Sequence, residues 1–191
     1  MRFKILFLLG FSVLLLAACG GNEIKDAHNW PVEDFSATNQ DGESFGLGDL
    51  EGKVWMADFI FTNCEDVCFP MTANMAKLQR MAAEAKIENI EFVSFSVDPS
   101  VDDPNTLSEF ANSFNADLQS WNFLTGYSQE EIESFAVDSF KTLVKKPQQG
   151  DQVAHGTSFY LVNQEGTIVK DYSGLNEIPF DEILEDIKTL Q

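Results

Sequence analysis

The fold is decided by one stretch of sequence, Val54-Trp55-Met56-Ala57-Asp58-Phe59-Ile60-Phe61-Thr62-Asn63-Cys64-Glu65-Asp66-Val67-Cys68-Phe69-Pro70. Its first part, Val54 to Phe61, is apolar except for Asp58, which is typical of a strand buried on both faces. Beyond Pro70, apolar residues recur at helical spacing, at Met71, Met75, Leu78, Ala82 and Ala85. Cys64 and Cys68 therefore lie at a strand-to-helix junction, near the positive end of the helix dipole, where the thiolate form is favoured.

Strand and helix patterns alternate along the rest of the chain. Strands are predicted at 90–97, 121–124, 157–162 and 167–172, helices at 106–114, 129–140 and 180–190, and a polar loop at 141–154. Phe35 to Phe45 predicts two short strands around an Asp-Gly turn. This order predicts an α/β fold, in which a mixed central sheet is flanked by helices and preceded by an N-terminal β-hairpin.

The N-terminus has the pattern of a targeting segment. A short basic region precedes the apolar run Ile5 to Leu16, which is too short for a membrane span of ~20 residues. The run ends in Leu16-Ala17-Ala18-Cys19, which resembles the lipobox of bacterial lipoproteins. This resemblance implies a signal peptide at 1–18, lipid on Cys19 and a polar, Gly-containing tether at 19–29. The domain, residues 30–191, is then expected on the outer face of the cytoplasmic membrane, where disulfides can persist.

The charge of the mature chain excludes several partners. The full sequence has 12 Lys and Arg against 31 Asp and Glu. Cleavage after residue 18 removes Arg2 and Lys4 and no acidic residue, so the net charge falls from −19 to −21. Such a field repels nucleic acid and anionic lipid surfaces. We expect neither as a partner.

With Cys19 assigned to lipid, the remaining dithiol has three possible roles: a redox couple, a metal clamp or a structural disulfide. The order of strand, dithiol, helix, strand, helix and terminal hairpin resembles the thioredoxin fold. Thioredoxins carry a buried aspartate at the position that matches Asp58, where it is implicated in proton transfer. An aspartate that is simply satisfied within the strand explains Asp58 equally well.

The resemblance is closer to one extracytoplasmic branch of that fold, the Sco/SenC copper-assembly proteins, and among these to the lipid-anchored Sco proteins of Gram-positive bacilli. It covers about Trp30 to Leu190. The matching segments are Asp58 to Cys64, Cys68, Pro70-Met71-Thr72, Ser94 to Pro99 with Asp102 and Pro104, and His155 with Thr157 to Val162. Glu65 and Phe69 stand where many members have proline, which affects the rigidity of the turn and removes no candidate ligand.

The resemblance implies a copper-binding metallochaperone that helps to assemble the CuA centre of cytochrome c oxidase. Its partner would be subunit II of the oxidase, and the protein would act as a monomer and not as an enzyme. The implied ligands are Cys64, Cys68 and His155, with Asp58 and Asp98 close to them. Thiolates are soft ligands that select Cu(I), and imidazole extends the site toward Cu(II).

Two rival functions use the same dithiol. A thiol–disulfide oxidoreductase would reduce the cysteines of the CuA site, and a redox sensor would cycle between thiol and disulfide. Copper binding needs His155, and simple exchange does not. A peroxidase of the peroxiredoxin type is disfavoured because the single mature arginine, Arg80, lies within the predicted helix.

Other charged side chains have simpler interpretations. His28 lies in the tether, where a solvated side chain is expected. Lys141, Lys145 and Lys146 gather in the loop before His155. We expect them to be solvated or to form a docking patch for an acidic partner.

Overall fold

The computed structural model describes residues 24–64 and 66–191. The predicted signal peptide, the lipidation site at Cys19 and the first part of the tether lie outside the described residues. Within the described part of the chain, no helix combines the length and the apolar composition that crossing a membrane requires.

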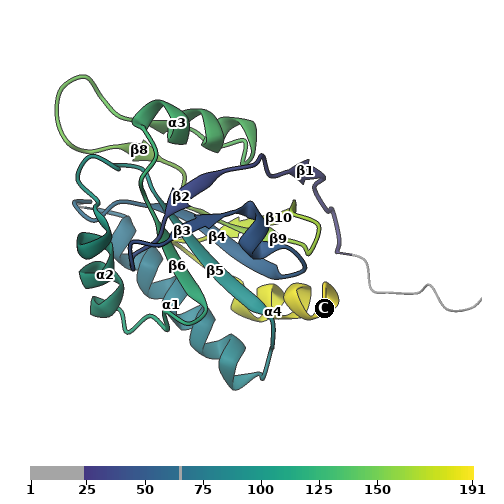
Figure 1. Cartoon of the computed structure of the whole chain (residues 1–191). Helices are drawn as coiled ribbons and strands as arrows, with labels where there is room; N and C mark the ends of the chain where they lie inside the picture. The colour runs from purple at the N-terminus through teal and green to yellow at the C-terminus, as the bar shows by residue number, and fades with distance from the viewer. Residues whose placement is uncertain (1–23, 65) are drawn as a thin grey trace, which may run out of the picture.

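A six-stranded mixed sheet forms the centre of the molecule (Figure 1). Its strands, in spatial order, are β1 (Trp30–Pro31), β10 (Thr167–Ser173), β9 (Ser158–Val162), β4 (Val54–Ile60), β5 (Ile90–Ser96) and β6 (Trp121–Leu124). Strands β4, β5 and β6 are parallel, whereas β9 pairs antiparallel with both β4 and β10. The prediction of a mixed sheet that contains parallel strands and a terminal hairpin is confirmed.

Helices and small hairpins cover the two faces of this sheet (Figure 1). One face packs on α1 (Cys68–Glu84), α2 (Pro104–Ser113) and α4 (Phe180–Thr189). The other packs on α3 (Gln129–Asp138) and on the N-terminal hairpin of β2 (Ser36–Thr38) and β3 (Ser44–Gly46), which leads into the 3₁₀ helix Leu47–Leu50. The predicted N-terminal hairpin is therefore confirmed.

Strand β4 is buried on both faces because its side chains alternate between the two cores. Met56 and Ile60 pack on the α1 side, and Trp55 and Phe59 on the α3 side. The alternation places Asp58 among the apolar residues of the α1 side, whereas the chain beyond Ile60 carries the dithiol to the end of the strand.

The segment before the histidine differs from the prediction. Expected to be a polar loop, it contains β7 (Val144–Lys145), which pairs antiparallel with β8 (Ala154–His155). Val144 lies opposite His155 in this pairing and is buried, as is Val153. Two-residue strands have no period to detect in a sequence, and β1 was missed for the same reason.

Helix α1 also begins earlier than predicted, at Cys68 instead of Pro70. Cys64 therefore precedes the helix, and the two cysteines do not share a regular helical turn. Helix α2 begins at Pro104, because the side chain of Asp103 accepts a hydrogen bond from the backbone of Thr106 and proline favours the first helical position.

Candidate metal centre

Three side chains from three parts of the chain meet at the end of β4. One ligand atom from each of Cys64, Cys68 and His155 lies within 4.8 Å of the other two. Cys64 comes from the loop after β4, Cys68 begins α1, and His155 ends β8. Both thiols are buried and the imidazole is half-buried. The structure thus brings together all three of the predicted ligands.

The loop that carries Cys64 is fixed by a buried carboxylate. Asp102 accepts hydrogen bonds from the backbone N–H of Thr62 at 3.3 Å, from the Thr62 hydroxyl at 2.5 Å and from the Ser96 hydroxyl at 2.5 Å. The backbone N–H of Cys68 then donates to Cys64 Sγ at 3.3 Å. These bonds hold the first sulfur over the start of α1 without a helical turn between the cysteines.

The imidazole is oriented by its own backbone. His155 Nδ1 lies 2.8 Å from the carbonyl oxygen of Gly156, which can only accept, so Nδ1 carries the hydrogen. In the neutral ring Nε2 then presents its lone pair to Cys68 Sγ, 3.2 Å away. Phe61 packs edge-on against the imidazole, with ring centroids 5.8 Å apart. A Cβ at position 156 would overlap the hydroxyl of Thr142. Glycine therefore allows the backbone at position 156 to lie this close to Thr142.

The pKa values of the two thiols are shifted in opposite directions. Burial opposes the ionisation of Cys64, but hydrogen bonds with His155, Cys68 and backbone groups outweigh it and lower the pKa of Cys64 from 9.0 to about 6. Burial, followed by the hydrogen bond to Cys64, raises the pKa of Cys68 well above its ordinary value. The expectation that this junction favours thiolates therefore holds for Cys64, through hydrogen bonds, and is wrong for Cys68, where desolvation dominates.

Asp58 lies close enough to His155 and Cys68 to interact with their charges. It is fully buried, and its Oδ1 accepts a hydrogen bond of 2.6 Å from the hydroxyl of Ser94, which accepts one of 2.9 Å from Trp121 Nε1. Its Oδ2 has no hydrogen-bond partner among the described residues. Burial raises the pKa of Asp58 to about 7, opposed by the Ser94 hydrogen bond and by attraction to His155.

Asp98 is tied to the segment that leads to the histidine. Its buried carboxylate accepts hydrogen bonds from Lys146 Nζ at 2.6 Å and from the Ser100 hydroxyl at 2.7 Å. Lys145 pairs with Glu133 at 2.7 Å. Lys141 and Lys145 are exposed, as expected. The expectation of a solvated side chain is wrong for Lys146, which is partly buried against Asp98. Lys145 and Lys146 both pair with acidic groups of the same domain. Their pairings attach the β7–β8 segment to the body of the protein.

Two residues that shape the metal centre could not be assigned a role from the sequence, and the environment of a third residue differs from the prediction. Asp102 is among the residues that match the family, but its contact with Thr62, 40 residues away, leaves no local signal of its role. Gly156 stands beside the candidate ligand, but its contact with Thr142 depends on the tertiary fold. His28, expected to be solvated, bonds to Asp171 at 2.8 Å and stacks on Trp30, far along the chain from the thiols.

The donor set suits a soft or borderline metal ion. Two sulfurs and one imidazole nitrogen are the ligands that Cu(I), Cu(II) and Zn²⁺ accept, and carboxylates, which hard ions prefer, are absent from this cluster. The tautomer of His155 leaves Nε2 free to coordinate, with Nδ1 held by the Gly156 carbonyl, as is common for metal-bound histidines. The residues therefore fit copper.

Comparison with known proteins places this chain in a family. The profile of SCO1/SenC matches residues 25–191. A solved SCO1/SenC family lipoprotein from Bacillus anthracis is 54% identical with a TM-score of 0.85, covering 88% of this chain and 99% of that one. BsSco, described with a disulfide switch and as a member of the Sco family of cytochrome c oxidase assembly proteins, is 50% identical with a TM-score of 0.81, covering 88% and 97%.

A more distant relative was solved with metal. ScoI of Bradyrhizobium japonicum, with copper bound, is 25% identical with a TM-score of 0.69, covering 84% of this chain and 99% of that one. The agreement with BsSco covers 88% of this chain, so the predicted thioredoxin-like α/β fold is confirmed. With its fold, its dithiol and its histidine in place, the chain belongs to the SCO1/SenC family.

Proposed function

We propose that this protein binds copper through Cys64, Cys68 and His155 and helps to assemble the CuA centre of cytochrome c oxidase. The observation that carries the proposal is the meeting of the two sulfurs and the imidazole nitrogen within 4.8 Å. The copper in the Bradyrhizobium relative and the oxidase-assembly role of BsSco support it. In this role copper is cargo, and a site with few protein ligands suits transfer.

The donor set supports binding of both copper oxidation states. Cu(I) is satisfied by the two thiolates, while Cu(II) needs a nitrogen or oxygen donor to complete its preferred geometry. Cys64 ionises readily, and metal binding would displace the proton that burial retains on Cys68. His155 supplies nitrogen without changing its tautomer. Asp58, buried beside the cluster, is a candidate to influence proton release from the thiols.

The family supports a proposed partner and a proposed location. We propose that the CuA domain of oxidase subunit II receives the copper and that lipid on Cys19 holds the protein at the outer face of the cytoplasmic membrane. The lipoprotein relative from Bacillus anthracis supports the anchor. In this arrangement residues 1–18 are removed as a signal peptide, residues 19–29 form a tether whose end at His28 is bound to the domain, and residues 30–191 act as one monomeric domain.

Thiol–disulfide exchange is a second candidate, favoured by the unequal acidity of the two thiols. Cys64, with its lowered pKa, has the properties of an attacking thiolate, and Cys68 those of a protonated second thiol. The disulfide switch described for BsSco supports thiol–disulfide exchange as a function. The two functions are compatible, since one dithiol can bind copper when reduced and cycle through a disulfide.

Complementation distinguishes the two functions. Cells that lack the protein would receive the wild type, Cys64→Ser, His155→Ala or His28→Ala, and oxidase activity and CuA absorption would be measured. A copper carrier predicts loss with Cys64→Ser and His155→Ala and full activity with His28→Ala, the matched control at the second of the two histidines. Normal oxidase in the His155→Ala cells would contradict the copper-carrier proposal and favour exchange alone.

A further inference from the structure

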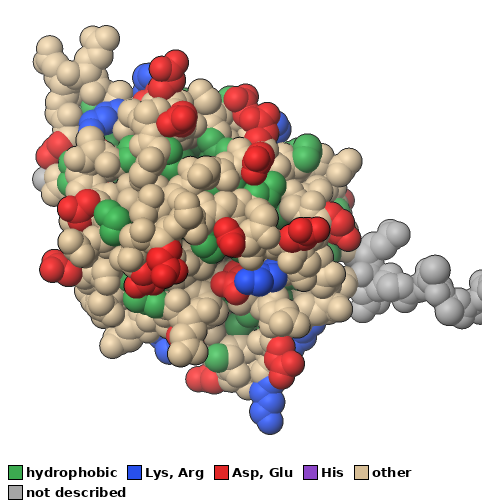
Figure 2. Space-filling view, viewed as in Figure 1, with side chains coloured by type: hydrophobic (Ala, Val, Ile, Leu, Met, Phe, Trp, Pro, Cys, Tyr) green, Lys and Arg blue, Asp and Glu red, His purple; other side chains and the backbone are tan. Residues whose placement is uncertain are grey.

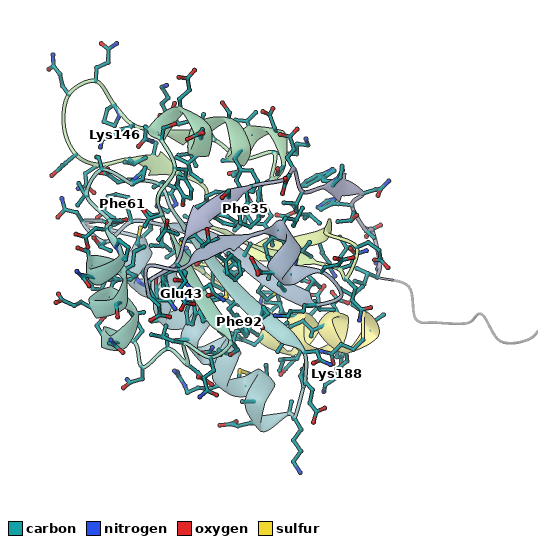
Figure 3. The ribbon with its side chains drawn as sticks, in the orientation of Figure 1. Phe35, Glu43, Phe61, Phe92, Lys146 and Lys188 are labelled. Atoms are coloured by element: carbon teal, nitrogen blue, oxygen red, sulfur yellow. The ribbon has the colours of Figure 1, made fainter. Side chains whose placement is uncertain are left out.

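A groove outside the metal centre combines a phenylalanine floor with a carboxylate rim. It lies between residues 33–36 and α3 and has a volume of about 500 Å³. Its floor contains Phe35, Phe95 and Phe135, whose ring centroids lie 5.2 to 5.4 Å apart. Phe35 and Phe135 are only half-buried. Figure 3 labels Phe35 just before β2, below α3. The aromatic surface is therefore accessible from solvent.

The rim of the groove is acidic. Its carboxylates, all exposed, are Glu33, Asp34, Glu130, Glu131 and Asp138. Glu131 caps the start of α3 through Ser128. No lysine or arginine lines the groove, and among the described residues no rim carboxylate forms a salt bridge. Figure 2 shows acidic and hydrophobic side chains together over this part of the surface. The groove thus offers, around an apolar floor, carboxylates that have no salt-bridge partner among the described residues; Lys141 Nζ donates to the backbone carbonyl of Asp138 beside it.

Charge determines which occupant this surface can accept. A second copy of the chain, with 31 acidic and 12 basic residues, would bring like charge to the rim, and an anionic membrane surface would do the same. A lysine or arginine side chain would gain both attraction to the carboxylates and favourable contact with the faces of the phenylalanine rings. An adjacent aromatic or aliphatic side chain would cover the floor and displace its water.

We propose that this groove docks a segment of a partner protein in which lysine or arginine residues flank an aromatic or aliphatic residue. The groove contains none of the three candidate copper ligands, so this inference does not rest on the proposed function. A partner held there would contact residues other than the candidate ligands Cys64 and His155. The groove would then provide a contact that selects the partner, separate from the chemistry at the thiols.

The test uses fluorescence anisotropy with the full chain in a nonionic detergent. The probe is a labelled peptide in which Lys-Phe-Lys-Gly is repeated three times, and its control replaces every lysine with glutamate. Ser134→Arg places a cation among the groove-lining residues, at an exposed position of α3. Val137→Arg is the matched control, since Val137 is exposed on the same helix and does not line the groove.

The proposal expects binding of the lysine peptide and none of the glutamate peptide. Ser134→Arg should weaken binding by about two- to thirty-fold, the equivalent of one or two exposed ion pairs, and Val137→Arg by much less. Equal weakening by the two variants would show attraction to the net charge alone and would overturn the proposal. Absence of binding to the wild type, or equal binding of both peptides, would overturn it as well.

Discussion

The carboxyl group of Asp58 should make the protein less stable as the pH rises from about 4 to about 7. Its folded-state pKa of about 7 exceeds the ordinary value of 3.8, because burial in the α1-side core disfavours the charge. The folded protein therefore keeps the proton over a range in which the unfolded chain loses it. Stability is unaffected below the unfolded-state pKa, decreases between the two values and is constant above the folded-state value.

The size of this effect follows from the same two values. A tenfold difference in proton affinity is worth about 1.4 kcal/mol, so the rise from 3.8 to about 7 corresponds to a loss of about 4 kcal/mol. Asp58→Asn removes the titration. The amide places an unpaired N–H where Oδ2 already lacks a partner among the described residues, a cost that does not vary with pH.

The assay is urea unfolding of the reduced, metal-free protein from pH 4 to pH 8, for the wild type, Asp58→Asn and the exposed control Asp34→Asn. The free energy of unfolding of Asp58→Asn should rise relative to the wild type by several kcal/mol across this range. Asp34→Asn should show no such trend. A difference between wild type and Asp58→Asn that stays constant within about 1 kcal/mol would refute the assigned pKa and the dry environment of this carboxyl group.

Three further perturbations test other parts of the structure. Brief treatment of the reduced protein with iodoacetamide at neutral pH should alkylate Cys64 in preference to Cys68, as read by peptide mass spectrometry; equal labelling would contradict their assigned acidities. Phe140→Ala should lower the free energy of unfolding by about 3–5 kcal/mol, because the fully buried ring packs among five aromatic side chains; a loss below 1 kcal/mol would contradict that packing. Lys146→Met should lower it by about 1–3 kcal/mol, because Asp98 remains buried without its cation; an unchanged urea midpoint would contradict the ion pair.

Much of the fold could be predicted because its strongest elements are long and periodic. The apolar run from Val54 predicted the central strand, and the helical spacing beyond Pro70 predicted α1. Boundaries were less predictable, since α1 starts at Cys68 after Val67, which provides no side-chain cap that the sequence could signal. The β7–β8 pairing could not be predicted, because each strand has two residues and is fixed by the burial of Val144.

The candidate ligands could be selected from the sequence, but their environment could not. A dithiol at a strand-to-helix junction can be recognised in a single sequence, and the family resemblance then pointed to His155. The opposite acidities of the thiols depend on how deeply each sulfur is buried, which no spacing records. The roles of Asp102 and Lys146 arise from contacts across 40 and 48 residues, respectively, so they became visible only in the folded chain.

Anaerobic copper titration of the reduced protein, wild type and His155→Ala, tests the central claim most directly. The account predicts one tightly bound copper per wild-type chain, with Cu(II) showing sulfur-to-copper absorption and nitrogen coupling in its paramagnetic resonance spectrum. His155→Ala should keep most of its affinity for Cu(I) and lose the nitrogen coupling and most of its affinity for Cu(II). Unchanged Cu(II) spectra and affinity in His155→Ala would contradict a site made of Cys64, Cys68 and His155.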